Sequence, residues 1–220
     1  MSVQTNKICQ RVPVGRTGSW MHPLGDRQGF SLLELLIVIA LLVTMYVLYL
    51  SAGSQNFQAK QKQACRKNLQ NTYMALKTYS IETADQFPMV ADAARSEEAL
   101  GFLVPRYTTV TESFICPGTK DKPPAAARDF SNSKISYAYY MGRNSLQGSQ
   151  MPLMSDEQVD TQAKPVGQLL FSADGKGRGN NHNKYGGVIL FCDGSAQLSG
   201  TNTSVALPLG SGVTLLNPKR

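Results

Sequence analysis

Residues 30–50 read FSLLELLIVIALLVTMYVLYL, and this stretch decides the fold. It contains no proline, glycine, lysine or arginine, and Glu34 is its single carboxylate. At a rise of about 1.5 Å per residue, a helix of this length spans roughly 30 Å, which is the thickness of the hydrocarbon core of a bilayer. The stretch therefore predicts one transmembrane helix.

A cleavable secretory signal peptide is the alternative interpretation of this stretch, with Ser51 and Gly53 as the small residues before the cut. The apolar core of a signal peptide is about 7–15 residues long, and this run is longer, which favours the membrane anchor. The positive-inside rule does not give the orientation of the span, because basic residues lie close to it on both sides. They are Lys7, Arg11, Arg16 and Arg27 before it and Lys60, Lys62, Arg66 and Lys67 after it.

The helical pattern continues beyond the apolar run. Between residues 58 and 84, apolar side chains recur at spacings of three and four, which is typical of one face of an amphipathic helix. These side chains are Cys65, Leu69, Tyr73, Leu76 and Tyr79. Gly53 costs such a helix only about 1 kcal/mol. The pattern predicts one helix over residues 30–83, apolar all round in its first half and one-sided in its second, and ended by Pro88.

After Pro88, glycine, proline, serine and asparagine punctuate the chain. We expect a short helix within residues 91–103. We expect strands at residues 135–140, 168–172, 188–192 and 196–198. The last two strands flank Asp193-Gly194, which predicts a type I′ hairpin, since that turn needs two residues with positive φ. A long helix followed by a short antiparallel sheet predicts an α+β fold.

The composition fits one ordinary domain with an appendage. The chain has 220 residues, 42% of them hydrophobic, and a formal net charge of +7. That charge permits a nucleic-acid or anionic-membrane partner. Removal of residues 1–29 leaves 18 basic and 14 acidic residues, a net charge of +4. No basic stripe interleaved with aromatic residues remains, so we expect no nucleic-acid partner.

Four cysteines occur in the chain, at Cys9, Cys65, Cys116 and Cys192. They are too few for a disulfide scaffold and lack the C-x-x-C spacing of zinc sites. The simplest interpretation is that they are buried or unpaired thiols, and the sequence leaves the disulfide state of Cys65, Cys116 and Cys192 open.

The junction before the apolar run carries the functional information. A basic, polar leader ends in Gln28-Gly29, and the apolar run opens at Phe30 with Glu34 as its fifth residue. This junction resembles the class III signal of type IV prepilins and type II secretion pseudopilins. The resemblance implies cleavage after Gly29 by a prepilin peptidase and methylation of the Phe30 amine. Residues 64–70 and 84–88 also look like pseudopilin sequence.

Glu34 is the residue expected to govern subunit assembly. A carboxylate in an apolar segment is costly unless it is paired, and its own span offers no basic partner. The resemblance implies that Glu34 meets the Phe30 amine of a neighbouring subunit and so sets the axial stagger of the helices. The alternative is a Glu34 carboxylate that lies near the membrane edge and reaches water.

A second resemblance lies near the C-terminus. Residues 181–194, NHNKYGGVILFCDG, look like the prepilin-associated domain named for a histidine followed after nine residues by Asp-Gly. Here ten residues separate His182 from Asp193, which weakens the transfer of residue roles. We expect His182, Asp193 and Gly194 to organise a structural turn.

Residues 174–180, DGKGRGN, resemble the glycine-rich calcium-binding loops of some major pseudopilins. Asp174 and Asp193 are the candidate calcium ligands. Lys176 and Arg178 oppose a strongly cation-binding loop, and hydrogen-bonded turn chemistry is the alternative use of these residues. We expect no other cofactor.

The sequence predicts that the chain is not an enzyme. His22 and His182 are its only histidines, and no G-x-S-x-G elbow, P-loop or zinc motif accompanies them. Two alternatives remain. One is a single-pass enzyme with catalytic His182 and Asp193, and the other is a membrane-tethered module whose β-domain binds a wall or surface glycan.

Taken with the resemblance, these patterns predict a pilin-like α+β protein. The expected parts are a leader at residues 1–29, a transmembrane half-helix at 30–50, an amphipathic half-helix at 51–88 and a periplasmic α+β domain at 89–220. The resemblance implies a type II secretion pseudopilin in the bacterial inner membrane, assembled into a periplasmic filament, with a type IV pilus or competence pilin as the alternative. Its implied partners are related subunits, the prepilin peptidase, the membrane, and an assembly platform with its ATPase.

Overall fold

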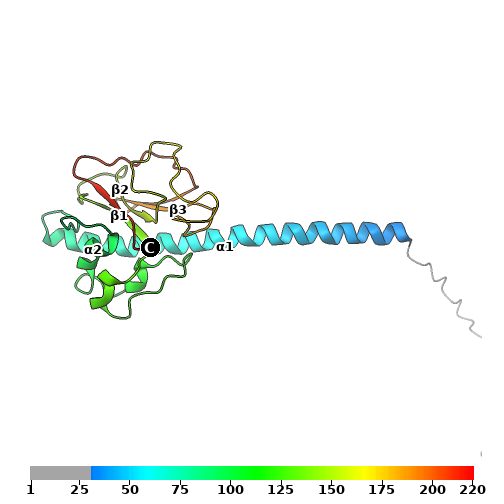
Figure 1. Ribbon diagram of the computed structural model, residues 1–220, viewed down its shortest axis with the longest axis horizontal. Helices are drawn as coiled ribbons and strands as arrows, with labels where there is room; N and C mark the ends of the chain where they lie inside the picture. Colours follow the sequence, from blue (N-terminus) through cyan, green and yellow to red (C-terminus); the bar gives the residue numbers. More distant parts are fainter. Residues whose placement is uncertain (1–30) are drawn as a thin grey trace, which may run out of the picture. The chain divides into compact units, whose positions relative to one another are not determined.

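The computed structural model describes residues 31–220 (Figure 1). Its α-helices are α1 (Leu32–Glu82) and α2 (Ser96–Leu100). Short 3₁₀ helices lie at Gly101–Leu103, Thr111–Phe114 and Ala127–Asn132. The strands are β1 (Tyr137–Met141), β2 (Pro152–Asp156), β3 (Gly187–Phe191), β4 (Ala196–Ser199) and β5 (Thr214–Leu216). The chain divides into two compact units between Met45 and Tyr46, and the sheet lies wholly in the second.

The predicted α+β class is confirmed, because an apolar N-terminal helix precedes one antiparallel sheet. This arrangement is consistent with a pilin-like fold. Helix α1 covers nearly all of the predicted 30–83. It ends through a left-handed turn, with φ of 50° at Ala84 and 65° at Asp85. The Asp85 N–H donates to the Ser80 carbonyl at 2.9 Å, so the helix is closed before it reaches Pro88.

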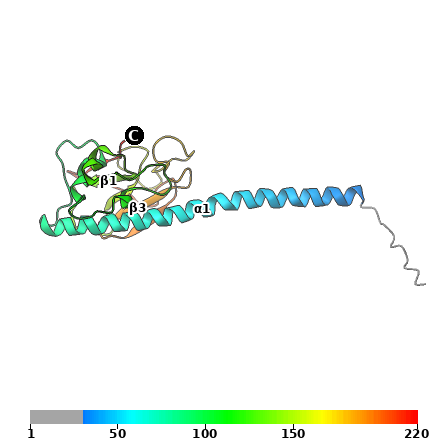
Figure 2. The same ribbon diagram turned by 90° about the horizontal axis from the view of Figure 1, so that it is seen from below.

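The predicted apolar face of α1 packs into the main core of Tyr46–Arg220. Cys65, Leu69 and Leu76 are fully buried, and Tyr73 and Tyr79 are partly buried against the same cluster. Within this unit α1 runs along the sheet (Figure 2). Burial of several such side chains, each contributing about 1.5–3 kcal/mol, holds the helix to the strands.

The sheet has the strand order β4-β3-β2-β1-β5, and every neighbouring pair is antiparallel. Both of its faces are covered. From β1, Tyr137 and Tyr139 belong to the core beneath α1, whereas Ala138 and Tyr140 belong to a cluster on the other face. Every residue of β1, β2 and β3 is therefore buried, and these strands show no alternation of polar and apolar residues.

The strand predictions are confirmed at three places and wrong at one. Residues 135–140, 188–192 and 196–198 correspond to β1, β3 and β4. Residues 168–172 form no strand, because only Leu169 makes an isolated bridge, to Asn202. Leu170 and Phe171 are nonetheless fully buried, so the apolar run marks core residues without a ladder.

Two strands were not predicted. Strand β2 starts with Pro152 and ends in the polar pair Ser155-Asp156, so its sequence lacks a strand signature. Strand β5 has only three residues, and Leu215 and Leu216 are buried by its pairing with β1. Tertiary pairing creates both strands.

The β3–β4 hairpin forms, but its turn is not the predicted type I′. Gly194 has a φ of +83°, whereas Asp193 is not among the residues with positive φ. The Gly194 N–H donates to the Phe191 carbonyl at 3.0 Å, and the Phe191 N–H donates to the Ser195 carbonyl at 2.9 Å. This is the pattern of a three-residue loop with a left-handed glycine. The Asp193 carboxylate accepts the Ser195 N–H and hydroxyl, which further stabilises the loop.

Substitution of Gly194 by alanine tests this turn. A Cβ there would lie 2.5 Å from Cε1 of Tyr73 on α1, and the φ of +83° is unfavourable for any side chain. We expect a loss of more than about 1 kcal/mol, or a fall in Tm of at least a few degrees, in thermal unfolding of the purified chain. Gly177→Ala is the matched control, because its φ is +69° and nothing lies within 4 Å of the added Cβ. Equal losses in the two variants would rule out a contribution from the Tyr73 contact.

Candidate functional site

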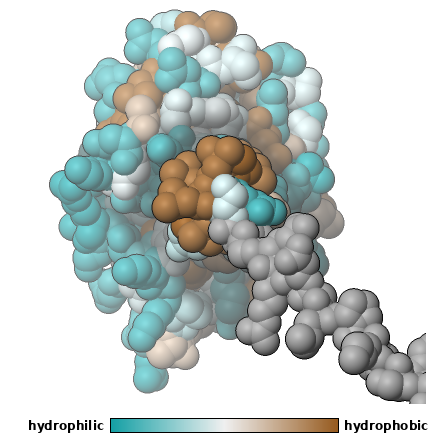
Figure 3. Space-filling model, turned by 90° about the vertical axis from the view of Figure 1, so that its right-hand side faces the viewer, coloured by the Kyte–Doolittle hydropathy of each residue, from teal (hydrophilic) through white to brown (hydrophobic). Residues whose placement is uncertain are grey.

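The N-terminal part of α1 presents apolar side chains on all sides. Leu32–Tyr49 is the one stretch in the described residues that is long and apolar enough to cross a membrane. Its large apolar side chains are between 43% exposed at Val38 and 80% exposed at Leu32 and Tyr49. They form the brown cluster in the foreground of Figure 3. A helix that is apolar all round needs lipid or other helices around it.

Glu34 lies in the first turn of α1 and is exposed. Within residues 31–220 its carboxylate makes no ion pair or hydrogen bond with another side chain. A carboxylate in the first turn is favoured by the helix dipole, but only by some tenths of a kcal/mol. Gly29 and Phe30 lie outside the described residues, so the cleavage site and the contact of Glu34 with a neighbouring Phe30 amine remain predictions.

The glycine-rich loop after residue 173 is organised by its own hydrogen bonds. Gly175, Gly177 and Gly179 all have positive φ. The Asp174 carboxylate accepts the Lys176 N–H and the Ser172 hydroxyl, both at 2.9 Å. These bonds, that from the Lys176 backbone first, lower the pKa of the Asp174 carboxyl.

Asp193 lies at the tip of the β3–β4 hairpin, where its carboxylate is bonded to Ser195. Neither Asp174 nor Asp193 belongs to a cluster of three or more candidate metal ligands in the described part of the chain. Calcium binding by these two residues therefore remains a prediction, and turn chemistry is what their contacts show.

The surroundings of His182 could not be predicted from the sequence. It is fully buried in the loop before β3, with its Nε2 atom 3.3 Å from Cys116 Sγ and 3.3 Å from Asp156 Oδ2. Cys116 is bonded to Cys65 of α1 in a disulfide. Both cysteines are buried, as expected, but they are not free thiols, because the fold brings together residues 51 positions apart.

Cys192 is a free, buried thiol. Burial raises the pKa of the Cys192 thiol to about 12, so it stays protonated at neutral pH. The interpretation as an unpaired, buried thiol is confirmed for Cys192.

Asp156 joins three segments of the unit. It ends β2, and its Oδ2 atom accepts the Val188 N–H of β3 at 2.8 Å. Its Oδ1 atom accepts the Asn181 side-chain amide at 3.0 Å, and that amide also donates to the Ser136 carbonyl at 2.8 Å. The sequence did not single out Asp156, because a carboxylate at the end of an unrecognised strand has no local signature. Asn181-His182, which contacts Asp156 in the fold, was the only sequence feature that pointed to this region.

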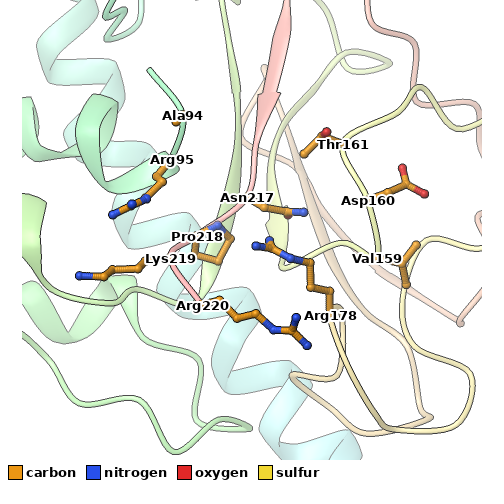
Figure 4. A pocket seen from close by; sticks show the side chains of 10 residues that line it. All are labelled: Ala94, Arg95, Val159, Asp160, Thr161, Arg178, Asn217, Pro218, Lys219 and Arg220. Atoms are coloured by element: carbon orange, nitrogen blue, oxygen red, sulfur yellow. The ribbon is translucent and has the colours of Figure 1, made fainter. Parts of the chain in front are cut away.

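A surface pocket of about 670 Å³ was also missed by sequence reasoning (Figure 4). It is lined by Arg95, Arg178, Lys219 and Arg220, together with Asp160 and apolar or neutral neighbours. Two of the charges are already paired. Arg178 lies 3.3 Å from Glu157, and Asp160 lies 2.7 Å from Lys164. The remaining positive charge favours anions in this pocket. The residues that line the pocket come from separate segments, so no local sequence motif predicts it.

Comparison with known proteins identifies the N-terminal element. Residues 25–45 match the family model of the prokaryotic N-terminal methylation motif. The match supports a class III prepilin-type leader, a feature found in type IV pilin-like and pseudopilin-like proteins in general. Such a leader implies processing by a prepilin peptidase and assembly with related pilin subunits, and the apolar helix fits a single-pass membrane anchor. Searches of curated proteins and of solved structures found no match.

The disulfide gives a prediction about stability. Replacing both Cys65 and Cys116 by serine removes a cross-link between positions 51 apart, which we expect to cost about 4 kcal/mol of unfolding free energy. The measurement is chemical unfolding of the non-reduced chain. Cys192→Ser is the control, because it removes a buried thiol that forms no cross-link. If the double variant were as stable as the control variant, the disulfide would carry no stability.

Proposed function

We propose that this chain is a structural subunit of a type II secretion pseudopilus, cleaved by a prepilin peptidase and assembled into a periplasmic filament through its N-terminal helix. The observation that carries the proposal is the methylation motif at residues 25–45, which overlaps the exposed apolar helix segment Leu32–Tyr49. We propose a structural role without catalysis, in which the unit Tyr46–Arg220 is the periplasmic part.

One apolar helix serves two surroundings in this proposal. In the inner membrane its side chains contact lipid, and in a filament they contact the same segment of neighbouring subunits. Since both surroundings are apolar, transfer between them changes the exposed apolar area little. The assembly ATPase and platform protein would supply the work of extraction.

Glu34 is the group in this segment that distinguishes the two surroundings. An unpaired carboxylate is costly in an apolar environment, and intramembrane carboxylates therefore pair with a cation or reach water. After cleavage, the Phe30 amine of the next subunit is a cation of the right sign at the same end of the helix. Pairing of the two charges would stabilise one axial stagger of neighbouring helices relative to all others.

The secretion system is favoured by the likeness of residues 64–70 and 84–88 to pseudopilin sequence, and a type IV pilus or competence pilus is the alternative. Gene deletion distinguishes them. Loss of exoprotein secretion, restored by the intact gene, supports the pseudopilus. Unchanged secretion together with lost surface pili or lost DNA uptake would assign the chain to the alternative.

Cleavage is tested by the mature N-terminus. We expect mass spectrometry of the mature chain to find an N-terminal, methylated Phe30. Gly29→Val should leave the leader attached, because a β-branched side chain at the scissile position does not fit a peptidase site selective for glycine. Gly25→Val, outside the scissile position, is the control and should be processed. A mature chain that begins near residue 54 would instead identify a conventional signal peptide.

The Glu34 proposal is tested by substitution in the membrane segment. Glu34→Leu should insert as well as the unmodified chain or better, because it removes a charge from the apolar helix. It should nevertheless fail to enter filaments, measured by cross-linking and by filament purification. Glu34→Gln keeps the shape and should also fail, whereas Glu34→Asp keeps the charge and should retain part of the incorporation. Normal incorporation of the leucine variant would contradict the pairing.

A further inference from the structure

Four buried side chains with metal-binding chemistry converge in the unit Tyr46–Arg220. They are Cys65 of α1, Cys116 in the segment after the second 3₁₀ helix, Asp156 at the end of β2 and His182 in the loop before β3. Their ligand atoms all lie within 4.8 Å of one another, and all four residues are buried. The proposed filament function makes no use of this cluster.

A disulfide alone does not explain the arrangement. A cystine needs no polar partner, yet the His182 imidazole lies 3.3 Å from the Cys116 sulfur and the Asp156 carboxylate lies 3.3 Å from that imidazole, with both side chains fully buried. Burial of such groups costs free energy unless they are hydrogen-bonded or paired with an opposite charge or a metal ion. Nδ1 of His182 has no hydrogen-bond partner in the described part of the chain.

The four donors match the preferences of Zn²⁺. Two thiolates, one imidazole and one carboxylate are all ordinary zinc ligands, and structural sites hold four of them in a tetrahedron. With Zn–S bonds of about 2.3 Å and Zn–N or Zn–O bonds of about 2.0–2.1 Å, the edges of that tetrahedron are roughly 3.3–3.8 Å long. The distances from His182 Nε2 to Cys116 Sγ and to Asp156 Oδ2 are both 3.3 Å.

The surroundings support these ligands. The Gly118 N–H lies 3.3 Å from Cys116 Sγ and is placed to stabilise a thiolate. The Val188 N–H and the Asn181 amide hold the Asp156 carboxylate in place, as outer-shell groups do in metal sites. The Nζ atom of Lys62 donates to the Tyr185 carbonyl at 2.8 Å, and burial lowers the pKa of this amine while the nearby Asp156 carboxylate partly opposes that shift.

We propose that the reduced form of the chain binds one Zn²⁺ ion through Cys65, Cys116, Asp156 and His182. The disulfide and the metal are then alternative cross-links between α1 and the segment that carries Cys116, and the metal would add β2 and the loop before β3. A dithiol reductant breaks the Cys65–Cys116 bond by supplying two electrons and two protons, and is itself oxidised to a disulfide. Zinc binding then releases the two thiol protons to solvent as both sulfurs become thiolates.

Cobalt is the spectroscopic probe for this site. The purified full-length chain is reduced under argon with a water-soluble phosphine, which becomes a phosphine oxide as water supplies its oxygen and the two thiol hydrogens. Titration with Co²⁺ should give one equivalent of tetrahedral d–d absorption with sulfur-to-cobalt charge transfer. Added Zn²⁺ should abolish both, and the oxidised chain should show neither.

Variants assign the ligands. Asp156→Asn and His182→Gln should weaken Co²⁺ binding more than about tenfold, and circular dichroism checks that each variant is folded. Asp92→Asn makes the same charge change at an exposed position outside the cluster, and Cys192→Ser removes the free buried thiol, so both should bind as the unmodified chain does. Cys9→Ser should also bind normally, which excludes Cys9 as a ligand.

A second measurement needs no variant. In the reduced, unmodified chain, Zn²⁺ should slow alkylation of Cys65 and Cys116, identified by peptide mass spectrometry, relative to Cys192. The proposal is overturned if the reduced chain gives no tetrahedral cobalt spectrum, if Zn²⁺ leaves the alkylation of both cysteines unchanged, or if folded Asp156→Asn and His182→Gln bind normally.

Discussion

The burial of one face of α1 against the sheet is the interaction on which the rest of Tyr46–Arg220 depends. Cys65, Leu69 and Leu76 supply this face, and they meet the tyrosines of β1 that point toward the helix. Without that helix, one side of the sheet would expose its largest apolar residues to water. The hairpin tip also rests on it, because Gly194 lies under the Tyr73 ring and the Tyr73 hydroxyl donates to the Cys192 carbonyl.

The first part of the same helix has the opposite property, because its apolar side chains are exposed. There the apolar side chains surround the axis and remain exposed, so that segment is stable only among lipids or other helices. A single continuous element thus carries a polymerisation or anchoring surface at one end and a folding scaffold at the other.

A polar node reinforces the packing of the sheet. The Asp156 carboxylate binds β3 and the preceding loop, and the cystine joins α1 to the same region. Buried polar groups of this kind contribute stability only when every partner is present, so the node demands a unique arrangement of its segments. The fold therefore combines an apolar helix–sheet interface with a polar centre at its edge.

Features that depend on local pattern could be predicted from the amino-acid sequence. These are the apolar run, the continuous helix with its buried stripe, strands β1, β3 and β4, and the presence of a hairpin at Asp193-Gly194. Each follows from periodicity, turn preference or the absence of helix breakers within a short window.

Only the tertiary structure decided what depends on distant residues. Strands β2 and β5 exist because neighbours pair with them, and residues 168–172 fail to become a strand because no neighbour forms a ladder with them. The turn is not type I′, because three residues connect the strands and only Gly194 among them is left-handed. The meeting of Cys65, Cys116, Asp156 and His182 follows from packing alone, since no sequence spacing relates a helix, a loop, a strand end and a second loop.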